Sequence, residues 1–284
     1  MIRSLPNTRP YTLGFKLYVA LFFVFLFAPL FMVCVLAFND SQFPALPWKG
    51  FTLEWFTADL PERVGIFHDS LNLSAIAVSF RVAFWVSIFS TLVGTCGAFL
   101  FEQENFRFKQ ALYFLMLAPL VIPGVILGIS ILLFANTLGM FFEDTFNLDV
   151  PLFRPGFWLV VLGQFAFIST LVTLVVSARL KKFDHSLEEA ALNLGATRLQ
   201  VIWHITLKFL RPAIIGAFAV AFLMSFENFN TTLFLVGSQS TLPITLYLQV
   251  RDGSTPVINA VSFLLIVGTS MLAVVNLTLS RKKE

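Results

Sequence analysis

The feature that most restricts the fold of this chain is a series of long apolar segments separated by short polar ones. Residues 17–38 include no charged side chain. At about 1.5 Å per helical residue, a segment of this length can cross a hydrocarbon core of about 30 Å. Lipid offers no hydrogen-bond partner to an open backbone, so segments of this kind cross as helices. The sequence therefore predicts an all-α integral membrane protein.

The composition supports the membrane assignment and excludes several classes of function. Of the 284 residues, 57% are hydrophobic and only 12% are charged, whereas about a quarter of a soluble domain is charged. Cys34 and Cys96 both lie in apolar segments, which argues against a disulfide framework or a thiolate metal site. His68, His185 and His204 are scattered without the spacing of metal ligands.

We predict a single transmembrane domain over residues 1–284, with six membrane-spanning helices. The first is interpreted as a retained anchor, because it is longer than the core of a secretory signal, about 7–15 residues, and lacks an A-x-A cleavage site. The predicted spans are approximately 17–38, 82–101, 111–134, 157–178, 209–230 and 259–279.

Lysine and arginine residues set the orientation of these spans. With both termini in the cytoplasm, fourteen of the nineteen basic residues fall on the cytoplasmic side, as the positive-inside rule requires. The net charge of +3 then reflects topology, and no nucleic-acid partner is implied. The fourteen are Arg3, Arg9, Lys16, Arg107, Lys109, Arg179, Lys181, Lys182, Arg198, Lys208, Arg211, Arg281, Lys282 and Lys283. Lys49, Arg63, Arg154 and Arg251 fall outside, and Arg81 lies at the outer boundary.

A polar connection at 179–208 joins the fourth and fifth spans. Ser186 and Glu189 have the spacing of a capping box, which predicts that a short helix begins near Leu187. Gly195 stands where this helix would end, since glycine adopts the left-handed conformation that closes a helix.

A second helix is predicted directly after Gly195. Thr197 and Gln200 repeat the capping-box spacing, and residues 201–205 return the chain toward the membrane. In the first helix, the small side chains of Ala190 and Ala191 leave a shallow surface on which a partner's groove could close. Spacing alone allows a second interpretation, an ordinary amphipathic connector.

The same connection resembles a family motif. Glu189-Ala190-Ala191, three residues, Gly195, nine residues and then Ile205-Thr206-Leu207 are similar to the EAA loop of bacterial ABC-importer permeases. The resemblance implies the six-helix type I importer permease fold, and it makes Glu189, Ala190, Ala191 and Gly195 the contact that couples the chain to an ATPase. Lys208 departs from the family, which usually has proline there.

Two further stretches resemble the spermidine/putrescine permeases within that family. They are Trp48–Phe56 and Ala118–Gly128. The resemblance implies a location in the bacterial inner membrane, surrounded by lipid. It also implies three kinds of partner protein: a second homologous permease, two ABC ATPase subunits and an external substrate-binding protein.

Three residues are candidates for a substrate pathway. Pro123, with Pro119, removes backbone hydrogen bonds inside the third span, so this helix should pack inside the bundle or face water; a kinked packing helix is the alternative. Glu227 lies about 22 Å along the fifth span, where a carboxylate needs a partner or water. The resemblance gives Glu227 a cation-facing role with Asn228 beside it, and the alternative places Glu227 in the outer headgroup layer.

The chain has no Gly-x4-Gly-Lys-Ser/Thr sequence to cradle a nucleotide phosphate. We therefore expect that it is not an enzyme, that it binds no cofactor itself, and that ATP and Mg²⁺ bind to the partner ATPase. The favoured function is polyamine import. The alternatives are a permease for an amino acid, another amine or ferric iron, and a secondary carrier or channel that uses Glu227. A membrane enzyme is disfavoured, because no acids, bases, nucleophiles or metal ligands cluster at one interface.

Overall fold

The computed structural model describes residues 9–60, 63–253 and 255–281. The chain forms two compact units, residues 74–245 and residues 1–73 with 246–284. Of the basic residues that set the predicted orientation, Arg3, Lys282 and Lys283 lie outside the described residues.

The unit of residues 74–245 contains the candidate site. Its elements are most of α3 (Ser70–Gln103), α4 (Lys109–Val121), α5 (Gly124–Phe146), the 3₁₀ turn η1 (Pro151–Phe153), α6 (Phe157–Leu180), α7 (Ser186–Asn193), α8 (Arg198–Val201), the π-helical turn η2 (Ile202–Thr206), α9 (Leu207–Phe226), α10 (Thr232–Leu235) and the start of α11 (Leu242–Gly253).

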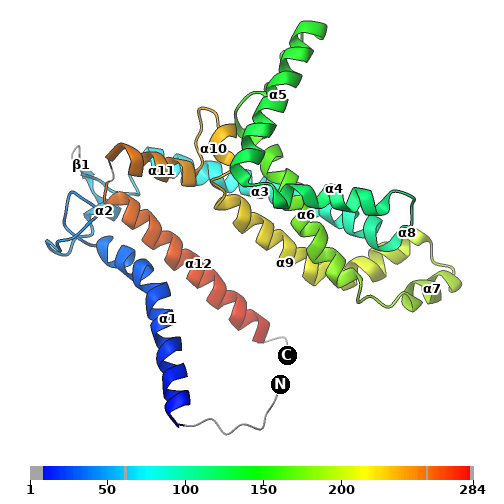
Figure 1. Ribbon diagram of the computed structural model, residues 1–284, viewed down its shortest axis with the longest axis horizontal. Helices are drawn as coiled ribbons and strands as arrows, with labels where there is room; N and C mark the ends of the chain where they lie inside the picture. Colours follow the sequence, from blue (N-terminus) through cyan, green and yellow to red (C-terminus); the bar gives the residue numbers. More distant parts are fainter. Residues whose placement is uncertain (1–8, 61–62, 254, 282–284) are drawn as a thin grey trace. The chain divides into compact units, whose positions relative to one another are not determined.

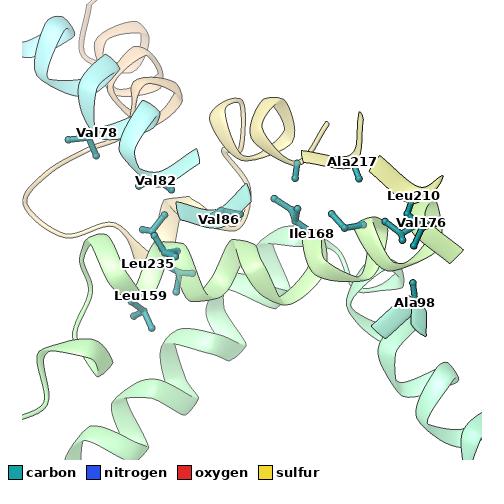
Figure 2. Packing of buried hydrophobic residues seen from close by; sticks show 14 of the residues in the cluster. Val78, Val82, Val86, Ala98, Leu159, Ile168, Val176, Leu210, Ala217 and Leu235 are labelled. Carbon is teal, nitrogen blue, oxygen red and sulfur yellow. The ribbon is translucent and has the colours of Figure 1, made fainter. Parts of the chain in front are cut away.

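Helices α6 and α9 form the centre of this unit and lie side by side (Figure 1). Their buried aliphatic side chains, among them Ile168, Val176, Leu210 and Ala217, interlock in one cluster (Figure 2). Small residues bring α3 against α6, since a Cβ at Gly94 would lie 2.7 Å from the Val172 side chain. In lipid, where burial of apolar surface drives little, such close backbone packing holds helices together.

The other unit contains α1 (Arg9–Leu36), α2 (Glu54–Thr57), the antiparallel pair β1 (Asp59–Leu60) and β2 (Arg63–Val64), and α12 (Val257–Arg281). Phe38 joins its parts, with ring centroids 5.4 Å from Phe51, 5.3 Å from Phe56 and 5.0 Å from Phe263. The ion pairs of Arg63 with Asp40 and Glu54 raise the pKa of its guanidinium, chiefly through the hydrogen bond with Glu54.

Within the described residues, five helical segments are long and apolar enough to cross a membrane, and two shorter apolar helices lie at Lys109–Val121 and Val257–Met271. The helix that contains the second predicted span, 82–101, is longer than that span, because α3 runs from Ser70 to Gln103. The polar residues at its start have partners: Asp69 accepts from Asn72, and Ser79 accepts from the Leu242 N–H. Arg81 therefore lies inside the helix, with its side chain exposed.

Two other spans differ from the predicted bounds. The segment at 111–134 is divided between α4 and α5, with a break at Ile122 and Pro123. Pro123 therefore breaks this helix, whereas the sequence predicted one helix, packed inside the bundle or facing water, with a kink as the alternative. The fifth helix, α9, ends at Phe226, earlier than the predicted residue 230, and Glu227 caps its C-terminus.

Candidate functional site

The connection between α6 and α9 forms an elbow, defined here as residues 184–206, and its first helix is capped differently from the prediction. Helix α7 begins at Ser186, but the capping box of Ser186 with Glu189 is absent. The Asp184 carboxylate instead accepts the Ser186 N–H at 3.0 Å. Hydrogen bonds from the Ser186 hydroxyl and N–H lower the pKa of the Asp184 carboxyl. An acid two residues upstream therefore performs the role predicted for Ser186.

Gly195 closes α7 in the left-handed conformation, with φ of +87°, as predicted. The Ala196 N–H donates to the Ala191 carbonyl at 3.0 Å, and the Gly195 N–H donates to the Leu192 carbonyl at 2.9 Å. This pair of bonds is the Schellman motif. No atom lies within 4 Å of a Cβ built at Gly195, so the backbone conformation alone favours glycine.

The second capping box is confirmed. The Thr197 hydroxyl accepts from the Gln200 N–H, and the Gln200 side chain accepts from the Thr197 N–H at 2.8 Å. From Arg198 the chain is helical to Phe226, through the π-helical turn η2. Lys208, which stands where the family has proline, is exposed in the first turn of α9. The elbow is therefore continuous with the fifth span.

A contact that the sequence did not reveal ties α7 to the base of α9. The Thr206 hydroxyl, which is fully buried, donates to Glu188 Oε1 at 2.6 Å. Glu189, the acid of the EAA motif, is exposed. Adjacent residues on a helix point to different sides, so Glu188 reaches Thr206 while Glu189 stays exposed. The sequence alone does not separate the two roles, because Thr206 lies eighteen residues further along the chain.

The outer face of the elbow is exposed and partly apolar. Ala190 is exposed and Ala191 is half-buried. Leu194 is 89% exposed, which is high for a leucine. A groove of about 410 Å³ lies between the two arms of the elbow. Its lining is Ala191, Leu194, Gly195, Ala196, Gln200, Val201, His204 and Ile205.

The second part of the candidate site is the break between α4 and α5. Pro123 has no N–H to donate to the Pro119 carbonyl, which a continuous helix would require. The gap receives the turn that follows α9: a Cβ at Gly124 would lie 3.0 Å from the Asn230 Cβ, and one at Gly128 would lie 2.7 Å from the Thr231 carbonyl oxygen. The two glycines thus form a notch into which the backbone of this turn fits.

A cavity of about 270 Å³ lies beside the notch. Its lining is Pro119, Leu120, Ile122, Gly124, Leu127, Phe167, Met224, Asn228, Asn230 and Thr231. Of the three predicted pathway residues, Asn228 lines this cavity, Pro123 lies between two residues that do, and Glu227 is exposed at the end of α9 outside the lining. The structure thus brings Asn228 together with the neighbours of Pro123.

Sequence reasoning missed Gln164, which is completely buried in α6 beside this region. Its Nε2 donates to the Thr232 hydroxyl at 2.8 Å, and its Oε1 accepts from the Ser225 hydroxyl. A signal was present, because Gln164 is the only amide in the apolar segment 157–178. An isolated amide at membrane depth needs a polar partner.

Comparison with known proteins gives concordant matches. Residues 90–283 match the model of the family described as binding-protein-dependent transport system inner membrane component. The putrescine transport system permease protein PotI of Escherichia coli K12 is 32% identical over 246 residues, which is 86% of this chain and 82% of the relative. The spermidine/putrescine transport system permease protein PotC of Haemophilus influenzae is 27% identical, over 92% of this chain and 94% of the relative.

Solved structures support the fold. A chain of a bacterial ABC transporter involved in the import of the acidic polysaccharide alginate superposes with a TM-score of 0.69 at 13% identity, covering 98% of this chain and 99% of that one. A chain of an amino acid ABC transporter superposes with a TM-score of 0.52 at 18% identity, covering 77% and 96%. At these identities the likeness concerns the fold alone.

Proposed function

Because this chain belongs to the family of binding-protein-dependent transport system inner membrane components, we propose that it carries a polyamine of the putrescine type across the inner membrane. The family assignment makes it a permease subunit of an ABC importer and a membrane protein without enzymatic activity of its own. The proposal adds the solute, the residues that contact it and the residues that receive the ATPase.

The observation that carries the proposal is the helical continuity between the elbow and the cavity. The helical segment Arg198–Phe226 has 29 residues, or about 43 Å at 1.5 Å per residue. Its first nine residues, 198–206, belong to the elbow, and the turn after its last residue lines the cavity. A displacement of the elbow is therefore transmitted to the cavity wall by one helical rod, and the Glu188–Thr206 bond makes α7 move with it.

The elbow suits a docking role because its exposed face is stiffened by local hydrogen bonds. We assign Glu189, Ala190, Ala191 and Gly195 to the contact with an ATPase subunit, as the EAA resemblance implies. Closure of two ATPase subunits on ATP and Mg²⁺ would press on two such elbows, one of them on a second homologous permease. The bundle would then move between inward-open and outward-open forms.

The cavity suits a cation because of the helix ends around it. Helices α4 and α9 both end there, at Val121 and Phe226, and α5 and the single turn α10 begin there, at Gly124 and Thr232. Helix C-termini carry partial negative charge, so the ends of α4 and α9 favour an ammonium group. We assign Glu227 as the carboxylate that first meets the cation, and Asn228 and the Pro123 break as parts of the path that follows.

The experiment that tests the proposal is uptake of labelled putrescine by proteoliposomes containing the full complex: this chain, its partner permease, the ATPase subunits and the external binding protein. Uptake should require internal ATP and the binding protein. Amino acids and ferric iron serve as competitors for the alternative substrates. Proteoliposomes with this chain alone and a cation gradient test for a secondary carrier, and uptake there would refute ATP-driven import.

A further inference from the structure

A chain of side-chain hydrogen bonds connects the middle of α6 to the cavity wall. The Ser225 hydroxyl donates to Gln164 Oε1. Gln164 Nε2 donates to the Thr232 hydroxyl at 2.8 Å, and the Thr232 hydroxyl donates to Asn228 Oδ1 at 2.9 Å. Gln164 and Thr232 have no exposed surface, and Ser225 is 3% exposed. Asn228, the last member, lines the cavity.

The direction of this chain is fixed by its members. The Thr232 backbone N–H also points at the Asn228 side chain, at 3.3 Å. A backbone N–H can only donate, so the Asn228 atom that receives it is the oxygen. The Thr232 hydroxyl has one hydrogen, which it gives to the same oxygen, so it must accept from Gln164 Nε2. Gln164 Oε1 is then left to accept from Ser225.

The packing of α10 against α6 puts Thr232 within reach of Gln164. A Cβ at Gly163 would lie only 2.2 Å from Leu235 Cδ1, so the buried Leu235 side chain packs directly on the α6 backbone at this glycine. Because the side-chain oxygens of Ser225, Gln164 and Thr232 and the Gln164 nitrogen are buried in an apolar bundle, leaving any of them unpaired is costly. The network therefore holds the turn between α9 and α10 in one position.

We propose that Gln164 is a positioning residue for solute binding: acting through Thr232, it fixes the turn of residues 227–231 at the cavity and sets which hydrogen-bonding groups the solute meets. The proposal rests on the proposed function, since it concerns the same cavity. With its side-chain oxygen occupied twice, the Asn228 side chain has only N–H donors left. Oxygen acceptors for an ammonium group must then come from other lining groups, including Asn230 and Thr231 in the same turn.

The first test is the kinetics of labelled putrescine uptake by the reconstituted complex carrying Gln164→Leu. Loss of the anchor should raise KM about five- to tenfold, the size expected from one net hydrogen bond, with Vmax per complex changed less than about twofold. A merely structural role would reduce the amount of folded complex and leave KM unchanged. Thr170→Val is the matched control, because it also removes a hydrogen bond of a buried side chain in α6, the part-buried bond from Thr170 to the Met116 carbonyl.

A double-mutant cycle tests the route of the effect. If Gln164 acts through Thr232, the double variant Gln164→Leu/Thr232→Val should have the KM of the worse single variant. Multiplication of the two single effects would overturn the proposal.

A second readout does not depend on the solute. In a background without Cys34 and Cys96, a cysteine introduced by Asn230→Cys reports on the cavity through its rate of reaction with a maleimide. Gln164→Leu should change this rate at least about fivefold, and Thr170→Val should leave it within about twofold. An unchanged rate with Gln164→Leu overturns the proposal. If the wild-type complex transports no putrescine, the proposed function fails, and the labelling rates still decide the role of Gln164.

Discussion

The two ends of the rod formed by α8, η2 and α9 are built in opposite ways. At the elbow, the caps join residues two or three positions apart, such as Asp184 with Ser186 and Thr197 with Gln200, and these side chains are exposed. At the cavity, Gln164 reaches residues 61 and 68 positions away, and the bonds are buried. The elbow is thus specified by its own segment and is free to bind a partner. The cavity turn takes its shape only when α6, α9 and α10 have packed.

The largest effect that would test this contrast is expected at the elbow, from Gly195→Arg. A non-glycine residue at a φ of +87° costs about 1–2 kcal/mol, and the long cation stands on the proposed docking face. We expect ATP-driven putrescine uptake to fall at least about 100-fold, from the added backbone strain together with the loss of docking. Membrane insertion and assembly with the partner permease should be normal.

Gly195→Asn is the matched control, because asparagine tolerates the left-handed conformation better than other residues. No atom lies within 4 Å of a Cβ at this position, so asparagine meets no clash. It should retain most of the uptake. Equal loss in both variants would indicate that Gly195 is needed for something other than conformation and bulk.

A smaller effect is expected at the other end of the rod, from Glu227→Gln. The change removes a negative charge from the end of α9 without altering its shape. Uptake of labelled putrescine should fall about tenfold at unchanged expression, since one charge at short range is worth roughly 1–1.5 kcal/mol in a partly solvated site. Glu143→Gln, which neutralises an exposed acid of α5, controls for the loss of acidic charge in general. Wild-type uptake with Glu227→Gln would remove Glu227 from the pathway.

The contrast also explains which parts of the molecule could be predicted from the sequence. The break at Gly195 and the cap at Thr197 depend on a few neighbouring residues, so spacing revealed both. Even there, Ser186 and Asp184 competed for one role, and the spacing rule selected the wrong one. Nothing local marks Thr232 as the partner of Gln164, because α10 reaches α6 only through the fold.

Some helix bounds could not be predicted for the same reason. Residues 70–81 lie outside the predicted second span of 82–101, yet they belong to α3, and Ser79 is satisfied by a backbone N–H 163 residues away. Pro123 was recognised as a constraint, but the depth of the break depends on Gly124 and Gly128 receiving Thr231. Hydrophobic periodicity reports what a segment can bury, and it does not report which distant group will satisfy a polar side chain within it.

The bond between the two arms of the elbow gives a third and smaller prediction. Thr206→Val removes the hydroxyl that donates to Glu188, whose side chain keeps 20% of its surface exposed. We expect a loss of about 1 kcal/mol from this partly solvated bond, seen as a two- to fivefold rise in ATP hydrolysed per putrescine imported. Glu188→Gln retains an acceptor and should stay near wild type. A normal ratio with Thr206→Val would mean that α7 moves with α9 without this bond.

The smallest effect separates the two caps of the elbow by pH. The pKa of Asp184 is lowered in the folded chain by its bonds from Ser186, so its contribution is fully present above the ordinary carboxyl pKa and is lost as pH falls through the folded value. Amide protection in α7, measured by hydrogen exchange on the purified complex, should therefore decrease in acid relative to α8. The Thr197–Gln200 cap has no titrating group and serves as the internal reference.

Asp184→Asn should remove the pH dependence while α8 stays unchanged, because an amide keeps the acceptor oxygen and cannot titrate. If α7 and α8 lost protection together, the two arms would open as one unit, and the local character of the elbow would have to be given up.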